Sequence, residues 1–180
     1  FEGDKSSYSE IDETKPASVY GWTKSIGEEV VLSTSSKFGV VRLSSVFGEG
    51  PNLVEAFRNK ADNPPVLGVS DQIIRPTYAV DVAHVLGKVI NKGIYPTGIT
   101  HLQNEGEPVS IADFAEEIYR QLEISTPISR VSLKEYSETR PVFAPRPKNS
   151  VFNLAKAHSL GMYMPDWKDA LSRYLKQNSK

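Results

Sequence analysis

A short apolar run, residues 39–46, limits what this chain can fold into more than any other stretch. It reads Gly-Val-Val-Arg-Leu-Ser-Ser-Val and follows a segment that predicts a helix over about residues 17–36. A short run rich in β-branched residues is typical of a strand buried on both faces of a parallel sheet. A helix that leads into such a strand is half of a βαβ unit, so the sequence predicts an α/β fold.

The helix predicted before this strand has clear local signals. Ser18 or Thr14 can cap its start, and Pro16 lies where proline is tolerated near the beginning of a helix. Its periodicity also predicts one apolar side. That side is formed by Ile26, Val30 and Val31.

Tyr20 and Lys24 form the candidate catalytic pair of this helix. They are four residues apart, which places them one turn apart on the same helical face. A cation near a phenol favours the phenolate, so such a tyrosine can protonate a forming alkoxide or deprotonate an alcohol. The spacing alone is a weak motif, because a helix with an interfacial tyrosine and a solvated lysine shows it too.

The rest of the chain alternates short strand-like and helix-like segments, with no repeats. The glycine-rich residues 47–51 follow the strand, where α/β sheets place ligands, although a plain turn into the next helix fits equally. Residues 1–16 and the proline-rich region 140–147 are expected to be irregular. Strands are predicted at 66–69, 72–74, 99–103 and 128–131, and helices at 52–62, 80–91, 109–122 (capped by Ser110), 153–160 and 167–177.

The composition is that of a folded protein without a strongly charged surface. The 180 residues carry a formal net charge of −1, and 39% of them are hydrophobic. The lack of a basic block argues against nucleic-acid binding, and no apolar run is long enough for a membrane span. The chain has no cysteine, which excludes thiol catalysis and fits a cytoplasmic protein. The three histidines have no ligand spacing, so no metal site is predicted.

Several motifs follow one another in an order that resembles a known family. The first are an acidic loop with Phe1-Glu2-Gly3-Asp4, Tyr8-Ser9-Glu10 and Pro16, then Tyr20-Gly-x-x-Lys24 with Gly27-Glu28, and the run 41–48. The later ones are Asp71-Gln72, Arg75-Pro76-Thr77-Tyr78, Asp81-Val82-Ala83, residues 146–150, Gly161, Pro165, Trp167 and Ala170-Leu171. Together they resemble the C-terminal part of an extended short-chain dehydrogenase/reductase, in the dTDP-4-dehydrorhamnose reductase-like, sugar-nucleotide-binding branch. The resemblance covers nearly the whole chain.

This resemblance implies an architecture. Residues 1–50 would be the C-terminal remnant of a Rossmann-like parallel-sheet domain, carrying the Tyr-x-x-x-Lys helix. Residues 51–180 would form mainly a small α+β substrate-binding domain, with segments that can return to the sheet. A glycine-rich dinucleotide fingerprint is absent from these residues, so the N-terminal dinucleotide-binding half is expected to lie elsewhere.

The resemblance also implies an activity and its residues. Tyr20 would exchange the hydroxyl proton of a nucleotide-linked sugar, while Lys24 would favour its phenolate and hold the nicotinamide ribose of NADP or NAD. Ser44 would also contact the cofactor. Arg75 would bind the nucleotide phosphates, because a guanidinium pairs bidentately with phosphate; a surface arginine before a proline is the alternative. The remaining substrate contacts would come from Ser45, Asn52 and Gln72, while Arg140 and Arg146 lie in a loop that closes over the ligand or stays solvated.

Three questions stay open at this point. The rhamnose-forming reductases usually have Ser-Trp where this chain has Ser44-Ser45, so the exact sugar nucleotide is not fixed. An epimerase or dehydratase would use the same Tyr20 and Lys24, and a non-catalytic regulatory subunit could keep the fold. Because the cofactor loop and the family's catalytic Ser or Thr are missing, these residues alone are not expected to form a competent dehydrogenase; they resemble a fragment. An exposed strand edge or apolar face, covered by another copy in a homo-oligomer, is expected.

Overall fold

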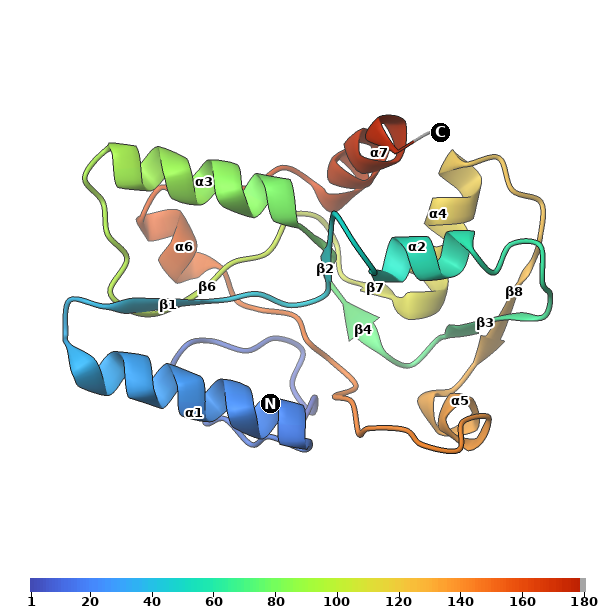
Figure 1. Cartoon of the computed structure of the whole chain (residues 1–180), viewed down its shortest axis with the longest axis horizontal. Coiled ribbons are helices and arrows are strands. Elements are labelled where there is room, and N and C mark those ends of the chain that lie inside the picture. The colour runs from blue at the N-terminus through green and yellow to red at the C-terminus, as the bar shows by residue number, and fades with distance from the viewer. Residues whose placement is uncertain (179–180) are drawn as a thin grey trace.

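A computed structural model describes residues 1–178 of the chain (Figure 1). Helices and short strands alternate along it, as expected for an α/β protein. They are, in order, α1 (Val19–Thr34), β1 (Gly39–Arg42), β2 (Val46–Phe47), α2 (Leu53–Arg58), β3 (Val66–Val69), β4 (Ile73–Ile74), β5 (Thr77–Tyr78), α3 (Ala79–Asn91), β6 (Gly98–His101), β7 (Val109–Ser110), α4 (Ile111–Gln121), β8 (Ile128–Val131), α5 (Leu133–Glu138), α6 (Ala155–Ser159) and α7 (Trp167–Gln177).

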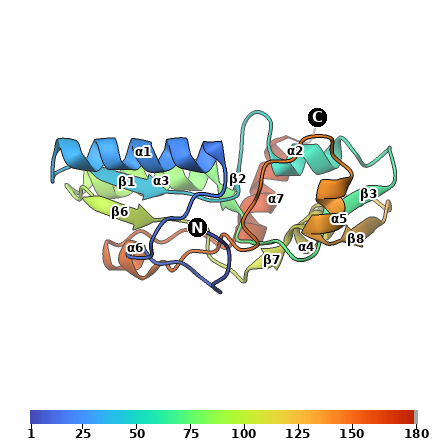
Figure 2. The ribbon, with the colours of Figure 1, turned by 90° about the horizontal axis from the view of Figure 1, so that it is seen from below.

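The first part of the molecule is built on the parallel pair β1–β6. Arg42 lies opposite His101, and Val41 lies opposite Thr100. Figure 2 shows α1 on one side of this pair and α6 on the other. Helix α3 packs with α6 in a separate apolar cluster that includes Leu102 and Met162. Segments from beyond residue 50 therefore complete the layer that begins with α1 and β1.

The second part is held by a larger core between short strand pairs and three helices. β3 pairs with β8 in parallel, β4 pairs with β7 antiparallel, and β2 pairs with β5 in parallel. Helix α4 packs directly on β3, where a Cβ on Gly68 would come within 3.0 Å of Ala112. The core takes Phe47 from β2, and buried aromatic and aliphatic side chains from α2, α4 and α7, among them Val54, Phe114, Ile118, Trp167 and Leu171.

The strand predicted over residues 39–46 is interrupted, and the prediction that it is buried on both faces is wrong. β1 ends at Arg42, and β2 begins only at Val46. Between them, Ser45 has a left-handed backbone with φ of 51°, which extended strands do not adopt. The residues of β1 are partly buried or exposed, because among the described residues β1 pairs only with β6 and α1 covers it loosely.

Helix α1 has its apolar side turned away from the protein. The side towards β1 carries small or polar residues, Gly21, Ser25 and Glu28, together with Leu32, and no residue of α1 is fully buried. The residues predicted to form its apolar side are exposed, with Ile26 at 48%, Val30 at 59% and Val31 at 38%. The sequence predicted an exposed apolar face without placing it, and these three side chains form such a face on α1.

Helix starts follow the predicted side-chain caps. Ser18 caps α1 by accepting a hydrogen bond from the Gly21 amide at 3.2 Å. Ser110 and Asp113 form a reciprocal capping box at the start of α4. Helix α5 was not predicted, although Ser132 and Glu135 form the same box there. None of the helices described in residues 1–178 is long and apolar enough to span a bilayer.

Two buried amide side chains after β6 join distant parts of the chain. Asn104 accepts a hydrogen bond from the Tyr78 amide at 2.8 Å and donates to Asp81 at 2.8 Å and to the Pro165 carbonyl at 2.9 Å. Gln103 accepts from the Phe152 amide and donates to the carbonyls of Arg75 and Ser150. Both are fully buried, so each lost partner would leave a polar group without water.

We expect Asn104→Ala to lower the free energy of unfolding by about 2–4 kcal/mol, because the Tyr78 amide and the Pro165 carbonyl lose their buried partner. Urea denaturation of the variant and the wild type measures the change. Asn91→Ala, at the exposed end of α3, is the matched control and should stay within about 0.5 kcal/mol. Equal effects of the two substitutions would contradict the role of Asn104.

Candidate active site

The structure places Tyr20 and Lys24 together at one end of the β1 layer. Helix α1 runs opposite to β1, so its first turn lies at the end of the layer where β1 finishes (Figure 1). The Lys24 ammonium lies 5.4 Å from the centre of the Tyr20 ring. Tyr20 is 71% exposed, and neither polar group has a hydrogen-bond partner among the described residues. The phenol and the ammonium are thus free to act on a ligand.

Ser44 and Ser45 lie at the carboxyl end of β1, where open α/β sheets place their ligands. Their hydroxyl oxygens are 3.4 Å apart. The Ser45 carbonyl accepts a hydrogen bond from the Thr77 amide at 3.1 Å, and Thr77 follows Arg75 by two residues. These contacts bring the end of β1 next to the segment that carries Arg75.

Arg75 is a half-buried cation with spare hydrogen-bond donors. Its Nη1 donates to the Phe152 carbonyl at 3.2 Å, while its buried Nε has no partner among the described residues. Burial lowers the pKa of the guanidinium, and the nearby carboxylates of Glu105 and Glu107 oppose this shift. A partly desolvated arginine with unused donors can bind an anionic group.

Asn52 and Gln72 already have structural partners. The Asn52 oxygen caps α2 by accepting from the amides of Val54 and Glu55, and its nitrogen donates to the carbonyls of Gly48 and Gly50. The same nitrogen also reaches the Tyr174 hydroxyl at 3.0 Å. This side chain therefore closes the glycine-rich loop as a turn into α2. Gln72 donates to the Pro147 carbonyl at 3.3 Å, which links it to the proline-rich loop.

The two arginines of the proline-rich loop differ in their contacts. Arg140 donates a hydrogen bond to the Tyr136 hydroxyl at 2.6 Å, and its guanidinium lies over the same ring at 4.9 Å. Arg146 is exposed. The loop is irregular, as predicted.

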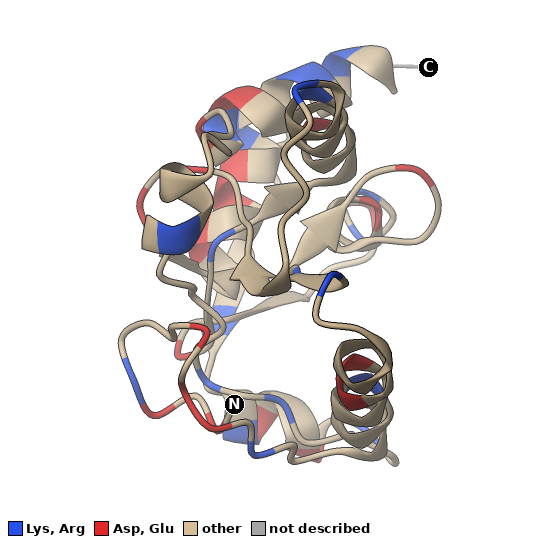
Figure 3. Ribbon diagram, turned by 90° about the vertical axis from the view of Figure 1, so that its left-hand side faces the viewer, with Lys and Arg blue, Asp and Glu red and all other residues tan. Residues whose placement is uncertain are grey.

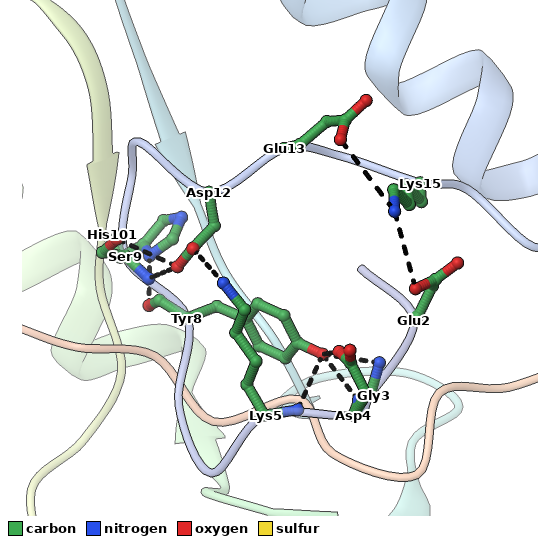
Figure 4. Close-up of polar contacts among 10 residues, drawn as sticks. All are labelled: Glu2, Gly3, Asp4, Lys5, Tyr8, Ser9, Asp12, Glu13, Lys15 and His101. Atoms are coloured by element: carbon green, nitrogen blue, oxygen red, sulfur yellow. Dashed lines mark hydrogen bonds and ion pairs between the residues drawn. The ribbon is translucent and has the colours of Figure 1, made fainter.

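The acidic N-terminal segment is folded around the Tyr8 hydroxyl (Figure 4). This oxygen accepts hydrogen bonds from the amides of Gly3 and Asp4 at 2.6 and 2.8 Å, and donates to the Asp4 carboxylate at 2.7 Å. The hydrogen bond from Lys5 lowers the pKa of the Asp12 carboxyl to about 2, and contacts from Ser9 add to the effect. A hollow of about 120 Å³ lies between these side chains.

Over the whole ribbon, acidic and basic residues are interspersed (Figure 3).

A polar cluster at the ends of β1 and β6 was not identified as such from the sequence. His101 is fully buried, its Nδ1 donates to the Tyr8 carbonyl at 3.1 Å, and its Nε2 accepts from Arg42 at 3.3 Å. The carboxylate of Glu10 accepts from the His101 amide at 2.9 Å. Arg42 in turn donates two hydrogen bonds to Glu28 of α1. Tyr8, Glu10, Glu28 and Arg42 all lie in segments that carried the family resemblance, but the sequence did not link them to His101.

A family model described as the RmlD substrate binding domain matches residues 1–180. The chain belongs to this family. The dTDP-4-dehydrorhamnose reductase of Aggregatibacter actinomycetemcomitans is 38% identical over 182 residues, covering 95% of this chain and 61% of the relative. The resemblance recognised in the sequence is therefore confirmed, as an extended short-chain dehydrogenase/reductase of the RmlD-like branch.

Solved structures of RmlD-like proteins have the same fold. The dTDP-4-dehydrorhamnose reductase of Clostridium acetobutylicum matches with a TM-score of 0.90 and 32% identity, covering 100% of this chain and 63% of that one. The Bacillus anthracis enzyme, solved in complex with NADP, matches with a TM-score of 0.86 and 30% identity, covering 98% and 62%. The chain thus spans about 60% of the length of these proteins, and the predicted α/β fold class is confirmed.

Because His101 is buried, we expect the free energy of unfolding to depend on pH through this side chain. Desolvation lowers its pKa from the usual 6.5, with Arg42 adding to the effect and Glu10 opposing it. Below about pH 6.5 the unfolded chain binds a proton that the folded chain does not, so stability falls as the pH falls from there. We expect His101→Phe to lose less stability than the wild type between about pH 7.5 and 5.5.

Urea denaturation at the two pH values measures this difference. His84→Gln is the matched control, because it also removes a histidine but at an exposed position on α3, outside this cluster. An identical pH dependence in wild type and His101→Phe would show that His101 does not contribute.

Proposed function

We propose that this chain is the C-terminal, sugar-nucleotide-binding part of an NAD(P)-dependent reductase that reduces a keto group on a nucleotide-linked sugar. The observation that carries the proposal is the Tyr20–Lys24 pair, which is exposed at the carboxyl end of β1 and has no side-chain hydrogen-bond partner within residues 1–178. The names of the relatives, dTDP-4-dehydrorhamnose reductases, favour reduction over epimerisation or dehydration. The retained pair also speaks against a non-catalytic regulatory subunit.

The chemistry assigned to this chain is a proton transfer. The Tyr20 hydroxyl donates its proton to the sugar oxygen as the carbonyl becomes an alcohol, and the Lys24 ammonium stabilises the phenolate that remains. Lys24 has free donors, which suits it to hold the ribose hydroxyls of a nicotinamide cofactor as well. The cofactor, when bound, supplies the hydride. Ser44 is proposed to lie on the cofactor side of the site.

Arg75 is proposed to bind the nucleotide phosphates. Its half-buried guanidinium has an Nε without a partner, and a phosphate can accept from such a fork bidentately. The sugar or base would lie against Ser45, Asn52 and Gln72. Because the polar atoms of Asn52 already bind the backbone, we assign it a role in shaping the loop around the ligand.

The roles proposed for the two parts of the chain follow the layers of the fold. Residues 1–50 would carry the catalytic helix as part of a dinucleotide-binding domain, and residues 51–180 would mainly bind the substrate. Strand β6 and helices α3 and α6 are the segments of the second part that pack in the first. We further propose a cytoplasmic location, which the cysteine-free composition supports.

We expect Tyr20→Phe, made in the complete enzyme, to lower kcat by a factor on the order of 100 or more with little change in KM, since only the proton donor is lost. NADPH consumption with dTDP-4-dehydrorhamnose measures turnover. Tyr95→Phe is the control, because Tyr95 is an exposed tyrosine outside the site. Undiminished turnover in Tyr20→Phe would rule out proton transfer by this residue.

For Arg75→Met, we expect KM for the nucleotide sugar to rise about 10-fold or more, because a charged hydrogen bond to phosphate contributes about 1.5–3 kcal/mol. The same steady-state assay measures KM and kcat separately. Arg120→Met, on the exposed face of α4, removes an equal charge and should leave both constants unchanged. A KM that stays at the wild-type value would place the phosphates elsewhere.

A further inference from the structure

Helix α1 carries the proposed proton donor, yet it packs only loosely against the rest of the chain. No residue of α1 is fully buried, and its side towards β1 offers mainly Gly21, Ser25 and Glu28. Its larger apolar side chains are exposed, including Trp22 at 59% and Val19 at 82%. Apolar burial is therefore too small to set the position of the helix along the strand precisely, and another interaction must do so.

A bidentate ion pair ties this helix to β1. Nε and Nη2 of Arg42 donate to the two carboxylate oxygens of Glu28, at 2.8 and 2.6 Å. The side chains are only 10% and 19% exposed, so the pair is largely shielded from water. Apart from the cap that Ser18 forms on the first turn, it is the only side-chain hydrogen bonding between α1 and the rest of residues 1–178. Two parallel hydrogen bonds fix the angle as well as the distance between the partners.

Arg42 is itself held in place on its other sides. It is the last residue of β1, and its Nη1 donates to His101 of β6 at 3.3 Å. Its guanidinium also lies 5.4 Å from the centre of the Phe1 ring. His101 is anchored in turn by the Tyr8 carbonyl and, through its amide, by Glu10. The ion pair thus connects α1 to the hydrogen-bonded polar cluster at the ends of β1 and β6.

The position of Glu28 along the helix links this pair to the catalytic residues. Glu28 lies one turn after Lys24 and two turns after Tyr20, which is about 12 Å along the helix axis. A helix is stiff over this length, so fixing Glu28 relative to the end of β1 also fixes the phenol and the ammonium.

We propose that Arg42 and Glu28 are positioning residues that set where Tyr20 and Lys24 lie relative to the ligand site. The inference rests on the proposed function, because it assigns the pair a role in that proton transfer. An error of about 1 Å in such a position can lower turnover by about 100-fold, while contacts with the substrate elsewhere are unaffected.

The test compares Glu28→Gln, Arg42→Lys and the double variant in the complete enzyme. Both single variants keep similar side-chain volume but remove the charge or the fork geometry. We expect kcat to fall roughly 10- to 100-fold in each, with KM for the nucleotide sugar within about twofold of wild type. The double variant should lose no more than the worse single variant, because the two residues act as one device. Glu29→Gln, the adjacent exposed carboxylate on α1, should retain wild-type kcat.

A second readout does not depend on turnover. Hydrogen exchange of the α1 amides, measured in the same proteins, should be faster in Glu28→Gln and Arg42→Lys than in Glu29→Gln. If the wild type has no reductase activity but exchange is still faster in Glu28→Gln and Arg42→Lys, the proposed function fails, while the role of the ion pair in holding α1 stands. If the wild type is active and Glu28→Gln matches Glu29→Gln in both kcat and exchange, the positioning role fails and the proposed function stands. Additive losses in the double variant would also overturn the proposal.

Discussion

Two buried amide side chains just after β6 must keep their hydrogen-bond partners, and the rest of the structure depends on this constraint. Gln103 and Asn104 are fully buried, and each makes at least three hydrogen bonds to segments distant in the sequence. Through them, the strand that completes the first layer holds the start of α3, the Arg75 segment, residues 150–152 and the turn before α7. A buried polar group that loses its partner destabilises the folded state, so one of these segments cannot move without the others.

Around this fixed centre, the protein distributes its stability unevenly. The second part has a continuous apolar core formed by α2, α4 and α7. The first part has a smaller cluster under α3, while α1 lies against β1 without a single fully buried residue. In a loosely packed helix, polar contacts of defined geometry take over the role that close packing has in a core. This is why a largely shielded ion pair can be important here, although an exposed one would contribute little.

Much of the fold could be predicted from local signals in the sequence. The caps at Ser18 and Ser110 and the strands 66–69 and 128–131 were predicted correctly, because these signals are short-range. The break of the 39–46 strand at Ser45 was missed, because a left-handed residue in an apolar run has no local signal unless it is glycine. An exposed apolar face was predicted but not its place at Ile26 and Val30 of α1, because periodicity shows that a helix has an apolar side but not what covers it.

The site was predictable in the same limited way. The i to i+4 spacing correctly placed Tyr20 and Lys24 on one face, where the ring and the ammonium now lie together. The contacts of Arg42 with Glu28 and of His101 with Tyr8 join residues 14 and 93 positions apart, and no pattern in a single sequence predicts such pairs. Asn52 shows the converse problem, since an asparagine in a glycine-rich loop fits both a ligand contact and the helix cap found here.

The left-handed backbone of Ser45 limits which amino acids can replace the serine at this position. Glycine, asparagine and aspartate adopt a positive φ at the lowest cost, whereas bulky or β-branched residues pay about 1–2 kcal/mol or more for it. Replacements at residue 45, at the carboxyl end of β1, are therefore expected to be small and polar. Larger changes in the shape of this edge of the sheet would have to come from neighbouring loops whose backbone accepts any residue.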